Sequence, residues 1–322
     1  MKIDLSIVIP VGSIDTYLLQ AERSVKRWGG GELSIEVILV FDDQEAKERY
    51  RRVTDRVSKH VYANRTDQKG PGICRNIGIQ KSSGDYILFL DADDLIEAVS
   101  LEMALIRARL ADADIAEFNY ALINEYGKTI SGAVRDEEFK NAQKSRLDRS
   151  KRLLMGELRD EAILQLYKTA FLRSSGALFK EGIYEDIEFR YKTLIEAARV
   201  IDIDEVCYKK RVHGNSITAS NSMPRNRVAY MQALAELRKS GLSKDSEQAL
   251  LYRVAGFLGL LAKEIMCAKD ADLQLKQEFR TIYREWGLEE YLRGKGEEHL
   301  SPREKLCEQA RVLLENRECN NP

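Results

Sequence analysis

The sequence predicts an α/β fold, in which a mainly parallel sheet flanked by helices is followed by a C-terminal α-helical region. Three observations lead to this fold class. Short apolar runs alternate with helix-like segments over the first two thirds of the chain, these runs lack polar alternation, and strand-like runs end near residue 224. Strands without polar alternation are typical of parallel sheets that helices cover on both faces.

The elements follow the order expected of βαβ units. Apolar, β-branched runs predict strands, and apolar positions at helical spacing predict helices. We expect strands at residues 5–11, 35–41, 61–63, 84–90 and 114–122, and helices at 17–28, 45–59 and 98–111. Ligands bind beyond the carboxyl ends of the strands in such sheets, so a site is expected in the loops that follow them.

The chain is predicted to form two domains, residues 1–224 and 225–322, because amphipathic helices such as 250–266 replace strands after about Pro224. Residues 135–160 are dense in charge. This density predicts a plain surface insertion or, alternatively, a mobile lid over a site.

Composition excludes several classes of protein. The 322 residues include 51 Lys and Arg against 52 Asp and Glu, so no global charge indicates a nucleic-acid partner. No apolar run approaches the roughly 20 residues of a membrane span, and residues 1–4 lead into a strand rather than a signal peptide, which predicts a cytoplasmic chain. Five scattered cysteines without Cys-x-x-Cys spacing predict buried or incidental thiols rather than disulfides or a zinc site.

Three carboxylates within four residues follow the predicted strand at 84–90. Asp91, Asp93 and Asp94 supply hard oxygen ligands suited to Mg²⁺ or Mn²⁺. A divalent cation held at the carboxyl end of a strand can also bind a diphosphate. The alternative is an acidic helix N-terminus, which the helix dipole favours without any metal. A second acidic pair begins at Asp42, after another predicted strand.

Four segments, in their order along the chain, resemble a known family. They are residues 6–11, residues 36–43, residues 70–78 leading into 84–94, and residues 184–189 followed by Tyr208 and 211–218. Together they resemble glycosyltransferase family 2, the inverting nucleotide-sugar transferases with the fold called type A. The resemblance covers about residues 3–220 and does not extend to the last hundred residues.

The resemblance implies a divalent cation, Mn²⁺ or Mg²⁺, that balances the charge of a diphosphate leaving group. It implies Asp93 as a ligand of this cation and Asp91 as a contact to the ribose or to the metal. His213 is implied as an imidazole ligand of the same metal or a contact to the diphosphate, and the alternative is an ordinary surface or core histidine. Asp94 is expected to be a neighbouring helix cap or an indirect contact.

The same resemblance implies a UDP-sugar donor. Asp42 would accept a hydrogen bond from the uracil imide, which would select uracil because other bases would leave this contact unmatched. Pro10 and Val11 would flank the base, largely through their backbone. Arg75 would pair with the diphosphate or with the acidic cluster. Arg211 is a second candidate for the phosphate, with an ordinary surface ion pair as the alternative.

Inversion at the anomeric carbon requires a base on the side of the acceptor, and a carboxylate serves best when partial desolvation brings its pKa nearer neutrality. The resemblance places this role on the pair Glu185 and Asp186. We expect Asp186 to be the base and Glu185 to support it or to bind the acceptor. The alternative is that both acids only begin a helix at 187–198, since acids favour first turns.

Two departures from the family leave the donor sugar open. The chain has Phe41 and Asp42 where the family often has two acids. It has Gly12 and Ser13 where the family often has a Tyr-Asn pair. The second difference puts the shape of the donor pocket in question.

We therefore expect a metal-dependent inverting hexosyltransferase that moves a hexose or N-acetylhexosamine from a UDP-sugar to a glycan or lipid-linked acceptor, in bacterial surface polysaccharide synthesis. The alternative is a non-catalytic nucleotide-binding assembly subunit of a glycan-synthesis complex. A sugar-nucleotide pyrophosphorylase is disfavoured, because residues 12–15 lack a Gly-rich phosphate loop with a basic residue. The C-terminal helices could pack only as their own bundle, form a homodimer interface, cover the acceptor groove or contact lipid peripherally at the inner face of the membrane.

Overall fold

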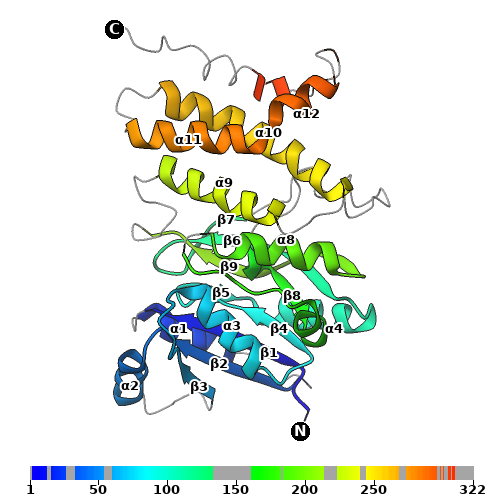
Figure 1. Ribbon diagram of the computed structural model, residues 1–322. Helices are drawn as coiled ribbons and strands as arrows, with labels where there is room; N and C mark the ends of the chain where they lie inside the picture. The colour runs from blue at the N-terminus through cyan, green and yellow to red at the C-terminus, as the bar shows by residue number, and fades with distance from the viewer. Residues whose placement is uncertain are drawn as a thin grey trace. The chain divides into compact units, whose positions relative to one another are not determined.

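The computed structural model covers most of the chain (Figure 1). It describes residues 2–12, 16–26, 33–53, 60–132, 161–182, 184–213, 223–239, 244–267, 273–295, 298, 300, 304, 305, 307 and 308. The charged stretch at 135–160, for which an insertion or a lid is predicted, lies outside the described residues, as do Ser13 and residues 214–218.

The chain divides into two compact units. The first consists of Met1–Gln143 and Arg159–Ser216, and the second of Lys144–Leu158 and Ile217–Pro322. The domain limits at residue 224 stay a prediction. The described helices include none that is long and apolar enough to cross a membrane.

The first unit is built on one sheet, whose strands can be followed in Figure 1. Their order across the sheet is β3-β2-β1-β4-β8-β6-β9-β5, with β7 paired to β6. The strands are β1 (Leu5–Val11), β2 (Ile35–Phe41), β3 (His60–Ala63), β4 (Tyr86–Phe89), β5 (Leu95–Ile96), β6 (Ile115–Ile123), β7 (Thr129–Gly132), β8 (Gln165–Lys168) and β9 (Val200–Arg211). The α/β fold prediction is thereby confirmed.

The two halves of this sheet differ in strand direction. Strand β1 is parallel to both of its neighbours, β2 and β4, and β2 is parallel to β3. Beyond β4 the sheet is mixed, because β8 is antiparallel to β4 and β6 whereas β6 and β9 are parallel. All seven residues of β1 are buried, as expected of a central strand covered on both faces.

Helices flank the sheet in the first unit. They are α1 (Thr16–Lys26), α2 (Gln44–Val53), α3 (Pro71–Lys81), α4 (Ala98–Leu110), α7 (Thr169–Ser175) and α8 (Asp186–Glu196), with a 3-10 turn, η1, at Ala162–Leu164. Helix α3 contacts β1 and β2. Its Gly78 lies so close to Val8 that an added Cβ would come within 2.2 Å of a Val8 methyl carbon. This close approach lets α3 pack directly on β1, while the Gly70 N–H just before the helix donates to Asp42 at the end of β2.

An aromatic cluster lies where β4, β8 and α8 meet. The rings of Phe179 and Phe189 are stacked with centroids 3.8 Å apart, and Phe89 contacts both edge-on at 5.2 and 6.0 Å. Tyr167 packs against Phe189 with centroids 5.5 Å apart. This cluster anchors the helix that begins at Asp186. The thiols of Cys74, Cys207 and Cys307 are buried and free, as predicted.

The second unit is helical where the structure describes it. Its longer helices are α9 (Met223–Lys239), α10 (Lys244–Cys267), α11 (Leu273–Trp286) and α12 (Leu288–Lys295). Helix α10 contacts the other three, and their buried apolar side chains form a core of their own. The C-terminal helical region is therefore confirmed, and its apolar stripes serve at least to hold the helices together.

Candidate active site

The carboxyl ends of three parallel strands lie at one edge of the sheet. In the register of the sheet, Val11 at the end of β1 is opposite Phe41 at the end of β2, and Val8 is opposite Phe89 at the end of β4. Asp42 and the acidic segment at 91–94 follow β2 and β4 directly. The sequence prediction that these acids share one edge of the sheet is confirmed.

The acidic segment forms a turn, closed by a hydrogen bond from the Asp94 N–H to the Asp91 carbonyl. The short strand β5 follows, and α4 begins only at Ala98, with no acid in its first turn. The alternative of an acidic helix N-terminus is therefore wrong. The turn instead directs its carboxylates towards strand β9 and helix α3.

Asp94 is buried and binds strand β9. One carboxylate oxygen accepts the Arg211 N–H at 2.6 Å, and the other accepts the Tyr208 hydroxyl at 2.8 Å. The same hydroxyl accepts the N–H of Asp91 at 3.1 Å. Burial, and then the nearby Asp91 and Asp93, raise the pKa of Asp94 well above its usual range. Asp94 thus acts indirectly, and the expected helix-cap role is wrong.

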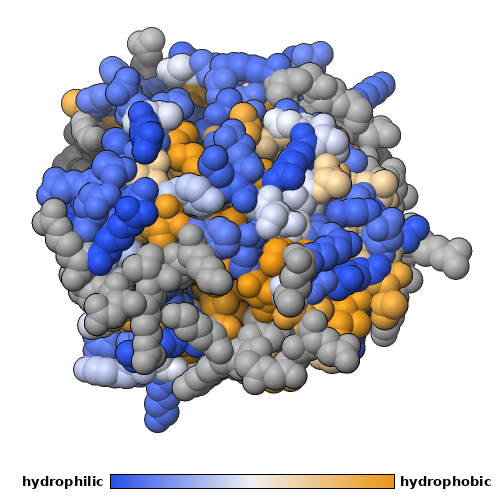
Figure 2. Space-filling view, turned by 90° about the horizontal axis from the view of Figure 1, so that it is seen from below, coloured by the Kyte–Doolittle hydropathy of each residue, from blue (hydrophilic) through white to orange (hydrophobic). Residues whose placement is uncertain are grey.

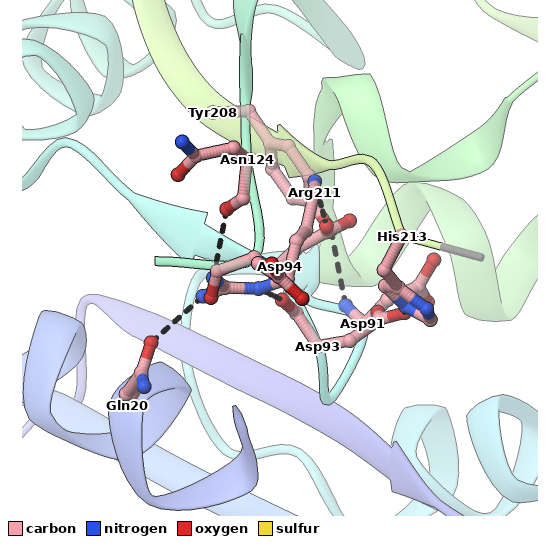
Figure 3. Close-up of polar contacts among 9 residues, drawn as sticks. Gln20, Asp91, Asp93, Asp94, Asn124, Tyr208, Arg211 and His213 are labelled. Carbon is pink, nitrogen blue, oxygen red and sulfur yellow. Dashed lines mark hydrogen bonds and ion pairs between the residues drawn. The ribbon is translucent and has the colours of Figure 1, made fainter. Parts of the chain in front are cut away.

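Asp93 and His213 meet at the same edge (Figure 3). A carboxylate oxygen of Asp93 lies 3.0 Å from the His213 Nε2, and the Asp93 side chain is 41% exposed. The imidazole is stacked on the Tyr17 ring with centroids 5.6 Å apart. Within the described part of the chain, no group of three or more His, Cys, Asp or Glu side chains could hold a metal ion. A cation here would take further ligands from its substrate.

Arg211 is buried between three segments. Its Nε donates to the Asp93 carbonyl at 2.6 Å, and its Nη1 donates to the carbonyls of Asn124 and Glu125 at 3.1 and 2.6 Å. Its Nη2 donates to Gln20 on α1 at 2.9 Å, which Figure 3 shows reaching up from that helix. The alternative of a surface ion pair is wrong, because Arg211 is only 3% exposed.

Arg75 on α3 connects the acidic turn to the start of α8. Its Nη2 lies 2.7 Å from Asp91 and its Nη1 lies 2.6 Å from Glu185. Burial alone would lower the pKa of Arg75, but Asp91, Glu185 and Asp186 together raise it. Of the two alternatives stated for Arg75, the structure contains the pairing with the acidic cluster.

Glu185 and Asp186 lie at the start of helix α8, and no side-chain hydrogen bond of Glu185, the N-cap residue, caps the helix. A carboxylate oxygen of Asp186 accepts the Ala162 N–H at 3.2 Å. Burial, and then Glu185, raise the pKa of Asp186 to about 7, although Arg75 and the Ala162 N–H oppose this shift. Asp186 can therefore exchange a proton near neutral pH.

Asp42 lies beside the loop that leads into α3. Its carboxylate accepts the Gly70 N–H at 3.0 Å, and its carbonyl accepts the Lys69 Nζ at 2.9 Å. The backbone N–H of Asp42 donates to the Val11 carbonyl, so the ends of β1 and β2 are joined here. Pro10 precedes Val11 on the same buried strand. Pro10, Val11 and Asp42, the three residues that the resemblance assigns to the uracil ring, thus lie together at the ends of β1 and β2.

Sequence reasoning missed the residues that support this site. Tyr17 and Gln20 on α1 contact His213 and Arg211, about 190 positions further along the chain. Tyr208 was part of the resembling segment but had no role assigned to it. No local sequence pattern marks Gln20 as a partner of Arg211, because the two residues are brought together only by the fold.

The fold and the acidic carboxyl edge define a glycosyltransferase of the type A fold. The family model "Glycosyl transferase family 2" matches residues 6–187, more than half of the chain. The chain therefore belongs to glycosyl transferase family 2. The prediction that it is a glycosyltransferase enzyme is confirmed at the level of the family.

A curated relative is the poly(ribitol-phosphate) β-N-acetylglucosaminyltransferase TarS of Staphylococcus aureus, which is 22% identical over 256 residues. The match covers 76% of this chain and 42% of that relative, so the chain spans less than half of its length. The crystal structure of S. aureus TarS 1-349 with UDP-GlcNAc has a TM-score of 0.72 and 17% identity, covering 97% of this chain and 88% of the other.

A second solved structure is the mannosyltransferase PcManGT of Pyrobaculum calidifontis in complex with GDP-Man and Mn²⁺. It has a TM-score of 0.54 and 14% identity, and the match covers 97% of this chain and 81% of the other. At these identities both structures support the fold of this chain.

Proposed function

We propose that the chain transfers a hexose or N-acetylhexosamine from a UDP-sugar to a glycan or lipid-linked acceptor, with inversion at the anomeric carbon. The observation that carries this proposal is that Arg75 joins the acidic turn to Glu185, the neighbour of Asp186, whose own pKa is raised to about 7. An acid that titrates near neutral pH can take the proton of an acceptor hydroxyl as the sugar is transferred. TarS, which was crystallised with UDP-GlcNAc, shares the fold.

A divalent cation, Mn²⁺ or Mg²⁺, fits the pair Asp93 and His213. Their oxygen and nitrogen atoms lie 3.0 Å apart at a partly exposed position. Cations of this kind often bind through one or two protein ligands and complete their coordination with substrate phosphates. When bound, the cation balances the charge of the diphosphate leaving group. The Mn²⁺ in the PcManGT complex supports the proposal.

The remaining roles belong to residues of the same edge. Asp42 accepts a hydrogen bond from the uracil imide, while Pro10 and Val11 flank the base through their backbone. Asp91 contacts the ribose or the metal. Glu185 supports the base, since its carboxylate already binds Arg75.

We propose a surface polysaccharide of a bacterium as the acceptor, in line with the poly(ribitol-phosphate) acceptor in the name of TarS. The transfer would take place in the cytoplasm or at the inner face of the membrane. The helices of the second unit would form a homodimer interface or bind acceptor lipid.

Calorimetric titration with UDP, GDP and CDP, each with Mn²⁺ and with EDTA, tests the donor site. We expect binding that prefers UDP and that weakens when the metal is removed. Asp42→Asn should remove the preference for UDP over CDP, whereas Asp43→Asn is the matched control because Asp43 caps α2 through the Ala46 N–H. Equal binding of all three nucleotides would contradict the assignment of Asp42.

A screen of UDP-sugars for transfer completes the test. Transfer from one of them, lost on chelation of the metal, is the expected result. Tight UDP binding without transfer from any UDP-sugar, with acceptor glycans supplied, would favour the non-catalytic assembly subunit instead.

A further inference from the structure

Arg75 occupies a position between the two halves of the proposed site. It lies on α3, is 4% exposed, and binds Asp91 with one terminal nitrogen and Glu185 with the other. Asp91 belongs to the side of the site assigned to the donor, and Glu185 adjoins the proposed base. One guanidinium group therefore links the carboxylates of both sides.

We propose that Arg75 is a positioning residue that fixes Asp91 and the Glu185–Asp186 pair in one arrangement and keeps the acceptor-side base ionised. This inference rests on the proposed function, because it takes Asp186 to be the base. It assigns Arg75 an effect on proton transfer from the acceptor, in addition to any effect on donor binding.

The surroundings of Arg75 make this arrangement rigid. The side chain of Asn76, the next residue on α3, donates to the carbonyl of Phe179 and accepts its N–H, both at 2.9 Å. At Gly72 an added Cβ would come within 2.5 Å of the Lys180 carbonyl and 2.8 Å of the Glu185 Cγ. The start of α3 is thus held against the segment that leads into α8.

The guanidinium group itself has little freedom to turn. Its central carbon lies 5.3 Å from the centroid of the Phe179 ring, and its buried Nε has no hydrogen-bond partner among the residues that the structure describes. Both terminal nitrogens are already bound to carboxylates, at 2.7 Å to Asp91 and 2.6 Å to Glu185. An arginine suits this environment because its two terminal nitrogens can bind two separate carboxylates at once, which a lysine cannot reproduce.

The charges around Asp186 give this arrangement a chemical consequence. Burial raises the pKa of Asp186 most, and Glu185 and Glu161 raise it further. Arg75 is the strongest influence in the opposite direction, ahead of the Ala162 N–H. Burial, and then the charge of Asp186, raise the pKa of the Tyr167 phenol on β8 well above its usual range, although Arg75 opposes this shift. Loss of the Arg75 charge should therefore leave Asp186 protonated at neutral pH.

The experiment measures kcat/KM for the acceptor as a function of pH in wild type, Arg75→Gln, Arg75→Lys and Arg173→Gln. For Arg75→Gln we expect the acid limb to move upward by about one pH unit, with a loss of about fivefold at pH 7, since an opposite charge within about 4–6 Å typically lowers a carboxyl pKa by about 1–3 units. Arg75→Lys keeps the charge, so its acid limb should stay near that of wild type while kcat falls.

Arg173→Gln is the matched control. Arg173 lies on α7 and is exposed, and it donates to the carbonyls of Ile79 and Ser82 near the end of α3 rather than to a carboxylate. This variant should lose stability with no change in the acid limb.

The results separate this inference from the proposed function. An unmoved acid limb in Arg75→Gln, with Asp186→Asn inactive, overturns the role of Arg75 and leaves the base assignment standing. Retained turnover in Asp186→Asn overturns both. A large loss of UDP affinity with an unmoved limb would assign Arg75 to the diphosphate instead. If Arg75→Gln does not fold, Glu185→Gln is measured instead. Because the charge of Glu185 raises the pKa of Asp186, this variant should move the acid limb of kcat/KM to lower pH, and an unmoved acid limb also overturns the inference.

Discussion

Buried carboxylates lie at both edges of the sheet in the first unit, and their pKa values are shifted in opposite directions. At the amino-terminal edge, one oxygen of Glu36 accepts the Ser6 hydroxyl at 2.6 Å, the Ser83 N–H at 2.5 Å and the Ser83 hydroxyl at 2.9 Å. Burial would raise the pKa of Glu36, but the bonds from Ser6 and Ser83 lower it overall. At the carboxyl edge, burial and neighbouring acids raise the pKa values of Asp94 and Asp186.

The difference shows that hydrogen-bond donors outweigh burial at Glu36, whereas at Asp94 and Asp186 burial and neighbouring acids outweigh the donors that are present. Glu36 is surrounded by groups that stabilise its anion, and it joins β1, β2 and the start of β4. The acids of the carboxyl edge lie close to one another and have a surplus of negative charge. Such a surplus costs stability and leaves a place for a proton or a cation, which is a common property of functional sites.

Some of the exposed apolar side chains of the first unit lie on helix α4, away from the proposed site. Figure 2 shows a view from below in which hydrophilic residues predominate and apolar residues appear in patches between them. On α4, Val99 and Leu110 are 72% and 82% exposed, on a helix that carries no residue of the site. These exposed apolar side chains thus lie on an element that takes no part in the proposed site.

The largest expected effect is that of Asp186→Asn. The variant should lose turnover by about a hundredfold to ten-thousandfold, the usual contribution of a general base, while its affinity for UDP stays near that of wild type. It should also be more stable than wild type at pH 8. The raised pKa means that ionisation of Asp186 reduces stability as the pH rises from its ordinary value of 3.8 to about 7, and the amide removes this loss.

Steady-state kinetics, UDP calorimetry and chemical denaturation check these three outcomes. Glu188→Gln is a suitable control, because Glu188 lies on the same helix and pairs with Lys180 at 3.4 Å. Wild type itself should gain kcat/KM with rising pH until about pH 7 and then level off. A variant with wild-type turnover would show that the acids of the carboxyl edge do not serve as the base.

An intermediate effect is expected from Arg211→Met, which removes the support of the acidic turn. Arg211 fixes the carbonyl of Asp93 and the end of the strand before His213. Loss of such an outer contact commonly weakens metal binding by about 10–100-fold. Titration with Mn²⁺ in the presence of UDP measures this loss.

The control for Arg211→Met is Arg107→Gln, since Arg107 pairs with Glu205 at the surface of the same unit. This control should bind Mn²⁺ as wild type does. If Arg211→Met folds and keeps its Mn²⁺ affinity, the buried contacts of Arg211 serve stability alone, and the carboxyl edge is organised without it.

The parts of the fold that sequence predicts best are the buried parallel strands. The bounds predicted for β1 and β2 agree with the structure because both strands are continuous apolar runs. Strand β9 was not predicted, since its twelve residues include several charged side chains that remain partly exposed, and it therefore lacks a continuous apolar run. Strand β5, with two residues, is too short for any periodicity.

The candidate site shows the same limit. Its acids could be placed because each follows a strand, and the carboxyl ends of parallel strands meet. The contacts of Arg211 with Gln20 and Tyr17 join segments that are distant in the chain, so no local pattern indicates them. The shifted pKa of Asp186 likewise depends on burial and on Arg75, which appear only once the chain is folded.

The smallest effect on catalysis is expected from Glu36→Gln, which tests the amino-terminal edge. The amide oxygen can still accept the bonds of Ser6 and Ser83, but it lacks the charge, so we expect a loss of about 1 kcal/mol in the free energy of unfolding at pH 7 and unchanged turnover. Because the pKa of Glu36 is lowered in the folded state, its contribution is complete above the ordinary value of 4.5 and declines as the pH falls below it. Denaturation of wild type and variant between pH 3 and 8 should therefore show the two stabilities converging at low pH, with His60, which faces Glu36 at 3.8 Å, adding to the difference only while it is protonated. A difference that instead grew towards low pH would mean that Glu36 is held in the protonated form, and the contrast between the two edges of the sheet would be lost.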